Sequence, residues 1–547
     1  SHLHLATLLA LISVCTAAKS PYSSFEYPDR ALQVLNGSWQ FSFAADIDIS
    51  HLDLAKVRWD DTVPVPGAFD ALERYHELRG TGFYRRSVRI PAGSGAALRV
   101  GACSFWCAVY VDDELLATHY TGGYTAFWVL IPPSQQEVRT LVVVADNRFD
   151  AIRAPSHGPQ YDFWQYGGLI RPVLLYTLPN ASKFVHRVEV RGAGLRGGNV
   201  SAAVDVSVLL GTLTGLSSYQ VVPGTRFCTS AAALPPEDGS PPSPSVTCPS
   251  SLNGLVHLRL IWDDDPASAL TVSAVVSDRW ARIQGLIVPY ARPWSLQSPT
   301  LHSLTVELLE AAVAPGCDLP VNASPACAPA VDAMRVTFGL RTVSIENGVL
   351  LLNGTPLRLR GFDRHEMHPS FASAVPVGQM QQDMVLLRSL GGNYVRGSHY
   401  QQDTRWVELC DTMGVALWTE PLSWQPKLAN LTDTWFMQQQ LLSMQALADA
   451  VVNRPSVFLV GFFNEGASDD ARSCGAYQAM AAAARARLDA LVTYASNKLE
   501  ADVCLNVSDV LSFNSYPAWY QGTPGEVGTF WSKLAQWAKA AFPSRPL

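Results

Sequence analysis

Strand-like and helix-like segments alternate along the second half of this chain. The alternation starts with an apolar strand pattern at Leu357–Gly361 and a helix pattern at Gly378–Leu390, and it continues to a helix pattern at Phe530–Phe542. Such alternation predicts parallel strands joined by crossover helices. Polar residues follow most of the predicted strands, which favours a (β/α)8 barrel over an open sheet. The segment contains no Gly-rich phosphate loop, so a nucleotide-binding sheet has no support.

The predicted barrel lacks its last strands. About six strands are expected, the last of them at Val510–Asn514, and the sequence stops at Leu547, where a seventh would begin. A barrel of eight strands cannot close without its last two, and open strand edges favour aggregation. We therefore expect the 547 residues to be a fragment of a longer protein.

Two β-rich regions are expected before the barrel. Alternating runs such as Gly82–Ile90 lie between turn signals in the first region and predict an all-β sandwich. Runs such as Val185–Val190 repeat this pattern in the second region, where we expect an immunoglobulin-like sandwich. The predicted fold class is therefore multidomain, β plus α/β. The expected segments are 1–18 as a signal peptide, 19–180 and 181–342 as the two β-domains, a Pro/Ser-rich insertion at 229–251, and 343–547 as an incomplete TIM barrel.

The N-terminal residues predict export. Leu3–Ala18 is apolar, ends in small residues and is too short for a good membrane span, so we interpret it as a signal peptide. The chain begins with Ser1 rather than Met, and we expect its N-terminus to be incomplete. The expected localisation is secreted, lysosomal or vacuolar. Asn-x-Ser/Thr tripeptides, which predict a glycoprotein, begin at Asn36, Asn180, Asn199, Asn322, Asn430 and Asn506.

The composition describes a globular chain without a basic surface. Its formal net charge is −7, with 48% hydrophobic and 16% charged residues, so we expect neither nucleic acid nor a membrane as a partner. The cysteines form no paired C-x-x-C units and hence no zinc pattern. Cys228 with Cys248 and Cys317 with Cys327 are candidate disulfides in an oxidising compartment. The remaining connectivity stays open.

The most informative single motif ends in Asn464 and Glu465. The apolar run Val457–Phe463 lies behind a proline and suits a strand that is buried on both faces, and barrel enzymes place their chemistry where such strands end. Glu465 is therefore a candidate catalytic acid. The competing interpretation is that Glu465 caps the next helix and that Asn464 is a turn residue.

Other predicted strand ends carry side chains of the kind that bind sugars. Charged and amide groups bind hydroxyls, and aromatic rings stack on apolar sugar faces. Taken singly, each histidine could be an ordinary core residue, but the convergence of these residues on one end of a barrel favours a sugar pocket. No metal-ligand set is evident, so we predict no metal and no cofactor. The residues are His365, Glu366, Arg396, His399, Glu420, Asn514 and Tyr516, with Trp424, Trp519 and Tyr520 as aromatic candidates.

These motifs together resemble glycoside hydrolase family 2. Tyr161–Val173, in the first β-region, is most similar to the β-glucuronidase branch of that family. The likeness covers nearly all of the chain after the signal segment, and its motifs occur in order. The other segments that carry it are Leu359–Glu366, Asn393–Tyr400, Cys410-Asp411 before Gly414, Arg454–Val457 leading to Asn464-Glu465, and Asn514–Tyr520.

The resemblance implies a sugar-binding jelly-roll domain, an immunoglobulin-like sandwich and a catalytic TIM barrel. Family members hydrolyse terminal β-linked sugars with retention of configuration. By the same resemblance, Glu465 is the acid/base and Asn464 binds the sugar 2-hydroxyl. His365, Asn514 and Tyr516 match positions that line the sugar subsite, Asp162 matches a first-domain residue that reaches the pocket, and Arg396 and His399 are assigned to substrate binding.

Retention requires two carboxylates about 5–5.5 Å apart, one acting as nucleophile and the other as acid/base. The family's nucleophile is a Glu at the end of the seventh barrel strand, so no residue here can be given that role. We expect the 547-residue chain to show negligible hydrolysis of aryl β-glycosides. Tyr516 is expected to position the nucleophile, and Glu366 and Glu420 to orient ligands or to pair with Arg396.

The sequence leaves the sugar open. A β-glucuronidase is the favoured activity, but Trp418–Trp424 differs from the usual β-glucuronidase segment, so a β-galactosidase is a real competitor and a β-mannosidase a weaker one. Some relatives on the galactoside side use magnesium. A different class of function is a non-catalytic glycan-binding protein, which the presence of both Asn464 and Glu465 disfavours. The expected partner is a carbohydrate substrate, and a homo-oligomer is left open.

Overall fold

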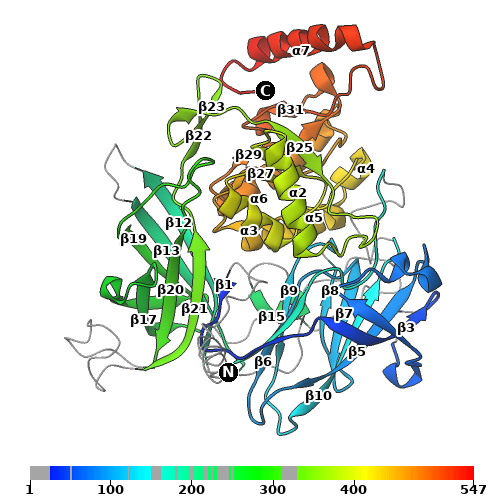
Figure 1. The fold of residues 1–547 in the computed structure, drawn as a ribbon, viewed down its shortest axis with the longest axis vertical. Coiled ribbons are helices and arrows are strands. Elements are labelled where there is room, and N and C mark those ends of the chain that lie inside the picture. Colours follow the sequence, from blue (N-terminus) through cyan, green and yellow to red (C-terminus); the bar gives the residue numbers. More distant parts are fainter. Residues whose placement is uncertain are drawn as a thin grey trace, which may run out of the picture.

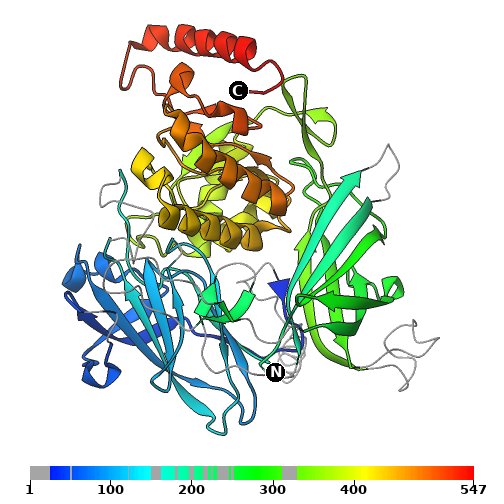
Figure 2. The same cartoon turned by 180° about the vertical axis from the view of Figure 1, so that it is seen from behind.

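The computed structural model describes residues 25–547, apart from 48, 50–51, 121, 150–161, 179–182, 196–201, 214–219, 223–225, 231–245, 248–251 and 311–328. Two β-rich bodies lie side by side, and an α/β body that carries the C-terminus lies across them (Figures 1 and 2). This arrangement agrees with the predicted β plus α/β class. The signal peptide, most of the 229–251 insertion and the cysteines Cys248, Cys317 and Cys327 lie outside the described residues.

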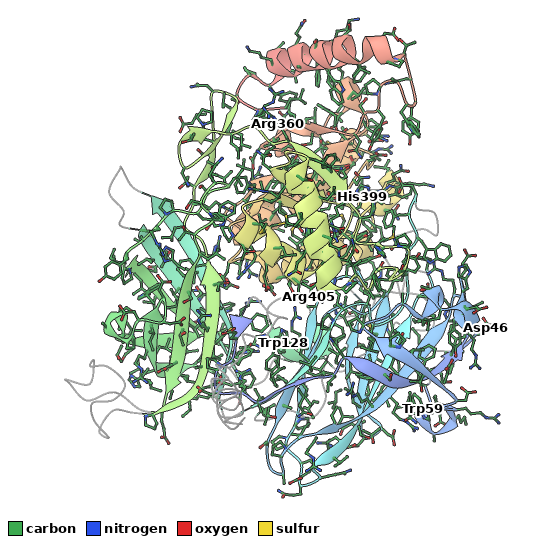
Figure 3. The ribbon with its side chains drawn as sticks, in the orientation of Figure 1. Asp46, Trp59, Trp128, Arg360, His399 and Arg405 are labelled. Carbon is green, nitrogen blue, oxygen red and sulfur yellow. A yellow bond between two sulfur atoms is a disulfide. The ribbon has the colours of Figure 1, made fainter. Side chains whose placement is uncertain are left out.

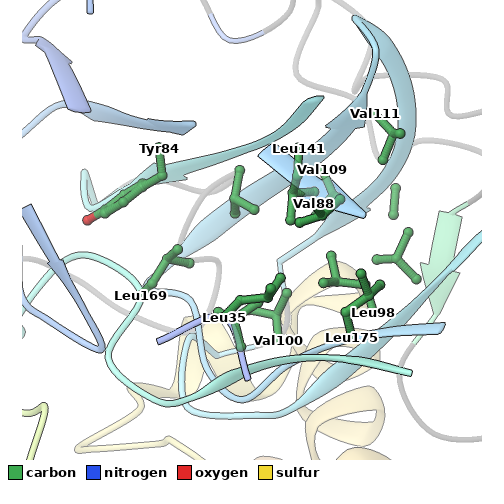
Figure 4. Close-up of a cluster of buried hydrophobic side chains, with 14 of the residues drawn as sticks. Leu35, Tyr84, Val88, Leu98, Val100, Val109, Val111, Leu141, Leu169 and Leu175 are labelled. Atoms are coloured by element: carbon green, nitrogen blue, oxygen red, sulfur yellow. The ribbon is translucent and has the colours of Figure 1, made fainter. Parts of the chain in front are cut away.

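The first β-body packs a six-stranded antiparallel sheet against a four-stranded one. Val109 and Leu141 of the larger sheet belong to the same fully buried cluster as Leu98 and Leu175 of the smaller sheet (Figure 4). Burying such side chains contributes about 1.5–3 kcal/mol each, so this core holds the two sheets together. In sheet order the strands are β4 (Asp61–Val65), β3 (Gly37–Ala44), β5 (Thr81–Arg89), β10 (Val138–Asp146), β7 (Trp106–Val111) and β8 (Glu114–His119), then β2 (Leu32–Val34), β11 (Val173–Thr177), β6 (Ala96–Val100) and β9 (Phe127–Ile131).

The second β-body is one eight-stranded sheet that folds over its own core. Val188 and Val336 lie on strands far apart in the sheet order, yet both belong to one buried cluster. The first described residues, Phe25–Glu26, pair with this sheet rather than with the first body. The order is β1 (Phe25–Glu26), β21 (Ala330–Phe338), β20 (His302–Leu309), β17 (Gly254–Trp262), β18 (Leu270–Ser277), β19 (Trp280–Val288), β13 (Ala202–Gly211) and β12 (Phe184–Leu195). One small sheet consists of β14 (Gln220–Val222), β15 (Arg226–Ser230) and β16 (Val246–Thr247). Another consists of β22 (Val343–Glu346), β23 (Val349–Leu352) and β24 (Thr355–Pro356).

The α/β body is a curled parallel sheet with helices on its outer face (Figure 1). Five strands pair in chain order, β25 (Gly361–Arg364), β26 (Tyr394–Gly397), β27 (Ala416–Thr419), β28 (Val457–Val460) and β29 (Leu491–Val492), and a parallel pair, β30 (Ala495–Ser496) and β31 (Ser512–Phe513), follows. The helices are α2 (Val377–Ser389), α3 (Thr404–Met413), α4 (Leu428–Leu431), α5 (Thr434–Val451), α6 (Cys474–Arg487) and α7 (Val527–Ala541). The predicted alternation is confirmed, and the sheet is a half-barrel. None of the helices in the described ranges is long and apolar enough to cross a bilayer.

One predicted strand was misplaced. The sequence placed the first barrel strand at Leu357–Gly361, but pairing with β26 begins at Gly361 and runs to Arg364. Leu357 and Leu359 instead pack around a buried cluster that includes Trp294 and Phe458. Gly361 is required where pairing starts, because a Cβ there would lie 1.7 Å from the Tyr394 carbonyl oxygen.

The cysteine pairing that the sequence left open is partly visible. Cys103 pairs with Cys107 and Cys474 pairs with Cys504, whereas Cys410 is buried and free. The second disulfide ties the start of α6 to a loop that follows β30, and so it braces the carboxyl end of the half-barrel.

A buried ion pair joins α3 to the segment before β28. Asp411 lies 3.0 Å from Arg454 and accepts a hydrogen bond of 3.0 Å from the Ser456 N–H. Arg454 also donates to the Thr337 carbonyl oxygen in the second β-body. The pair therefore connects the half-barrel to its neighbour.

We expect Asp411→Ala to lower the free energy of unfolding by about 3–5 kcal/mol, because it removes the carboxylate that pairs with the buried Arg454 guanidinium and accepts the Ser456 N–H. The measurement is the urea midpoint of the transition that reports the barrel. Asp469→Ala is the control, since its pair with Lys498 is long and partly exposed and is expected to contribute less than about 1 kcal/mol. Equal effects of the two substitutions would contradict the assignment.

Candidate active site

Most of the predicted site residues lie at one edge of the half-barrel. His365 follows β25, His399 follows β26, Glu420 follows β27, Asn464 and Glu465 come after β28, and Asn514 follows β31. Because parallel strands end at the same edge of a sheet, these side chains meet there. His399 is labelled in Figure 3 on this body.

Arg396 is the centre of the hydrogen-bond network. Its Nη2 donates to Glu420 Oε1 at 3.0 Å and to Asn464 Oδ1 at 2.8 Å, and its Nη1 donates to Asn514 Oδ1 at 3.1 Å. His399 Nδ1 lies 3.2 Å from both Arg396 Nη2 and Glu420 Oε1. The guanidinium is buried. It therefore orders side chains from several strand ends at once.

Glu420 carries the counter-charge of Arg396. It is fully buried, and Trp418 Nε1 donates to its Oε2 at 3.0 Å. Burial alone would raise the pKa of Glu420, but the Arg396 charge and the His399 hydrogen bond outweigh burial and hold the pKa below its ordinary value. The predicted pairing of Glu420 with Arg396 is confirmed. Glu366 was wrongly expected at the same site.

Glu366 belongs to the interface with the first β-body. Arg171, which comes just before β11, reaches its carboxylate at 3.3 and 3.4 Å. The same carboxylate accepts from the Asp403 N–H at 2.7 Å. The sequence could not distinguish the two carboxylates, because both follow barrel strands and only the fold shows which one faces the neighbouring domain.

Three amide side chains surround the carboxylate of Glu465. Asn514 donates to Oε1 at 2.6 Å, and Gln425 and Asn497 donate to Oε2 at 2.9 and 3.2 Å. Glu465 is partly exposed and has a left-handed backbone with φ of +54°, a conformation that non-glycine residues rarely adopt. The backbone is held in place because the Glu465 N–H donates to the Ala495 carbonyl oxygen at 2.8 Å.

Sequence reasoning missed two of these amides. Asn497 directly follows β30, so the rule that found the other strand ends could also have found it. Gln425 gives no such signal, because it lies six residues beyond the end of β27 and returns to the site only through its loop. We add both residues to the candidate site.

Aromatic and histidine rings pack together beside the hydrogen-bond network of Arg396. The His365 ring centroid lies 4.6 Å from Phe163 of the first β-body and 5.2 Å from His399. Burial lowers the pKa of His365 to about 4, with a further contribution from the His399 charge, so its ring is neutral at neutral pH. In the described part of the chain, the buried His365 Nδ1 and Asn464 Nδ2 have no hydrogen-bond partner. Such groups are available to a polar ligand.

Two predicted residues lie at the margin of this cluster. Asp162 is exposed, and the described residues include none that hydrogen-bonds with it, although the adjacent Phe163 contacts His365. Tyr516 is about half exposed and packs on Tyr520 with ring centroids 5.6 Å apart. The exposed rings of Trp519 and Tyr520 extend the aromatic surface next to the cluster.

No group of three His, Cys, Asp or Glu side chains within the described ranges is arranged to hold a metal ion. The site as it stands offers the partly exposed carboxylate of Glu465, the exposed carboxylate of Asp363 at 3.8 Å from Arg396, several amides, a buried cation and aromatic faces. That set can transfer a proton and bind hydroxyl groups.

We expect the neutral state of His365 to appear in the pH dependence of stability. Its pKa in the folded protein, about 4, lies below the ordinary value of 6.5, so the unfolded chain takes up a proton first as the pH falls. The contribution of His365 is therefore complete above pH 6.5 and is lost between pH 6.5 and about 4. In His365→Gln the melting temperature should fall less than in the wild type over this range.

The measurement is the difference in melting temperature between wild type and His365→Gln at several pH values from 7 to 4. His76→Gln, on an exposed turn of the first β-body, is the control, and we expect its difference from wild type to stay flat. A constant difference for His365→Gln would contradict the assignment.

Comparison with known proteins places this site in context. Residues 343–546 match the family model described as glycosyl hydrolases family 2, TIM barrel domain. The chain is 25% identical over 540 residues to the β-glucuronidase of Felis catus, covering 90% of this chain and 73% of that protein. It is 25% identical over 450 residues to a β-galactosidase of Vibrio vulnificus, covering 73% of this chain and 37% of that protein.

Among solved structures, a GH2 β-galacturonidase from Eisenbergiella tayi bound to galacturonate aligns with a TM-score of 0.75. The two chains are 23% identical, and the alignment covers 95% of this chain and 81% of that one. This likeness establishes the fold of the three bodies together.

Proposed function

Since this chain belongs to glycoside hydrolase family 2, we propose that it is a β-glucuronidase, a retaining exo-acting hydrolase in which Glu465 is the acid/base. The observation that carries the proposal is the position of Glu465. Its partly exposed carboxylate lies at the carboxyl end of the half-barrel among three amides, one of which, Asn514, is held by Arg396. A general acid must come within hydrogen-bond reach of the glycosidic oxygen, and the partial exposure of this carboxylate leaves it accessible to a substrate.

The sugar would be bound by groups that have no partner within the protein. Asn464 is fixed through Oδ1 by Arg396 and Asn514, which leaves its buried Nδ2 to donate to a hydroxyl. Neutral His365 offers its Nδ1, which also has no partner among the described residues. The exposed faces of Trp519 and Tyr520 suit the apolar face of a sugar or an aglycone.

We assign the nucleophile to no carboxylate among the described residues of the site. Retention needs a second carboxylate that is free to attack the anomeric carbon. Glu420 does not qualify, because Arg396, His399 and Trp418 all engage it and it is fully buried. It holds the network in place and does not take part in the reaction.

The glucuronide assignment rests on the relatives. The mammalian protein that this chain matches over most of its length is a β-glucuronidase. A β-galactosidase is the second candidate, because a bacterial β-galactosidase matches at the same identity over a shorter part of the chain. Both are β-glycosidases with the same proton-transfer requirement.

We further propose that the protein travels the secretory pathway. The disulfides Cys103–Cys107 and Cys474–Cys504 support an oxidising compartment, since such bonds are rare in the cytosol.

We expect Glu465→Ala, in the protein made from its full coding sequence, to lower kcat for a phenyl β-glucuronide by about 100- to 10,000-fold, because general acid catalysis is lost. A substrate with a good leaving group, such as a dinitrophenyl glucuronide, should be affected less at the glycosylation step. Azide should restore turnover by replacing the general base and should give a β-glycosyl azide. The measurement combines initial rates with identification of that product.

Glu346→Gln, on an exposed hairpin of β22 and β23, is the control and should leave the rate unchanged. Equal loss with both leaving groups and no rescue by azide would remove Glu465 from the acid/base role.

A panel of methylumbelliferyl β-glucuronide, β-galactoside and β-mannoside tests the sugar. We expect kcat/KM for the glucuronide to exceed that for the galactoside by at least about 100-fold, since a buried site built for a charged or hydrogen-bonding group rejects an analogue that lacks it. The opposite order would favour the β-galactosidase. No turnover of any substrate by the full-length protein, with sugar binding retained, would favour a glycan-binding protein.

A further inference from the structure

A small cavity lies where the first β-body meets helix α3 of the half-barrel. Its volume is about 10 Å³, which is the space that one water-sized sphere requires. Arg405, labelled in Figure 3, lies at the end of the half-barrel that faces the first β-body, and Trp128 lies at the junction. The lining residues are Arg99, Gly101, Ala126, Arg171, Pro172, Gln401, Asp403, Thr404 and Arg405.

The cavity wall is rich in positive charge. Arg171 and Arg405 both have carboxylate partners, since Arg171 lies 3.3 Å from Glu366 and Arg405 lies 2.5 Å from Asp403. Arg99 has none. It extends from β6, is only 6% exposed, and forms no hydrogen bond or ion pair with any residue that the structure describes. The centroid of the Phe25 ring lies 5.8 Å from the guanidinium.

A buried charge without a partner is unfavourable, so the Arg99 guanidinium calls for a counter-charge. Burial lowers the pKa of Arg99, because removing the guanidinium from water disfavours its charged form. Asp403 contributes electrostatically to Arg99, but its carboxylate is bonded to the Arg405 guanidinium and to the Arg405 N–H, which it caps. Glu366 is held by Arg171 and by the Asp403 N–H.

Glu408, on α3, is the carboxylate that competes for the role of counter-charge. It contributes electrostatically to Arg99, but its Oε1 is buried without a hydrogen-bond partner in the described part of the protein. Burial raises the pKa of Glu408 to about 7, so a large fraction of it is neutral near pH 7. Glu408 therefore leaves Arg99 incompletely compensated.

Helix α3 adds to the positive potential of the cavity. The helix is Thr404–Met413, and its first residue, Thr404, lines the cavity. Asp403 caps the Arg405 N–H, and the positive end of the helix dipole further favours negative charge at this position. The cavity thus combines a helix N-terminus with an unpaired, buried guanidinium.

We propose that this cavity binds a single small monovalent inorganic anion, of the size of chloride, between Arg99 and the N-terminus of α3. The cavity holds one sphere, which excludes phosphate or a sugar acid. The bound anion would fasten β6 of the first β-body to the half-barrel. It would lie beside the ion pair of Arg171 and Glu366. Arg171 comes just before β11, and Glu366 follows His365. The proposal concerns stability and does not depend on the proposed enzyme activity.

The test is the melting temperature of the full chain in sodium chloride and in sodium gluconate at equal ionic strength, near pH 7. We expect chloride to raise the melting temperature of the wild type by about 2–4 °C in a saturable manner, because an anion bound only to the folded state stabilises it. In Arg99→Met the two salts should give the same value. Arg89→Met, which removes an exposed arginine paired with Glu137, is the control and should keep the chloride effect.

Two further measurements keep the proposal testable if Arg99→Met folds poorly. Crystals of the wild type soaked in bromide should show an anomalous peak between Arg99 and Thr404. Glu408→Gln should keep or enlarge the chloride effect, because it removes the competing carboxylate. The proposal is overturned if chloride and gluconate give equal melting temperatures in the wild type, if the bromide peak is absent, or if the chloride effect persists in Arg99→Met.

Discussion

The buried guanidinium of Arg396 is the interaction on which the candidate site depends. A charge in this position is tolerated because Glu420 pairs with it and because Nη1 and Nη2 donate to the oxygen atoms of two amides. Those acceptors are the amides of Asn464 and Asn514. The energetic need to satisfy one cation therefore fixes Asn464, which we propose binds the sugar, and Asn514, which holds Glu465.

Buried contacts make the first β-body part of the candidate site. Arg171 reaches across to Glu366 next to His365, and Phe163 packs on the His365 ring. Tyr124 of the first body stacks on Tyr400 of the barrel with ring centroids 4.0 Å apart. Since these contacts are buried and partly charged, the sandwich cannot shift without disturbing the wall of the pocket. This coupling gives a physical reason for the Tyr161–Val173 motif to accompany the barrel motifs.

The sequence predicted the parts of the fold that depend on periodicity and on strand ends. Alternating strands and helices predicted the half-barrel, and the strand-end rule found Arg396, Asn464 and Glu465. It failed where the path of the chain matters more than its pattern. Gln425 returns through a loop, the Cys474–Cys504 bond joins residues 30 positions apart, and Gly361 shifts the first strand through a close backbone contact. Such features depend on distances between segments, which a single sequence does not contain.

The position of the Glu465 carboxylate depends on the loops next to it. Phe463 and Glu465 both have positive φ, +49° and +54°, at a cost of about 1–2 kcal/mol each for residues with a side chain. This conformation persists because neighbouring loops hold it. The Asn464 N–H donates to Ser423, and the Glu465 N–H donates to Ala495. An extended chain would carry the carboxylate onward along the strand direction. The strained turn instead places it within hydrogen-bond distance of the amides of Gln425 and Asn497, so the strain in the backbone sets the position of the proposed proton donor.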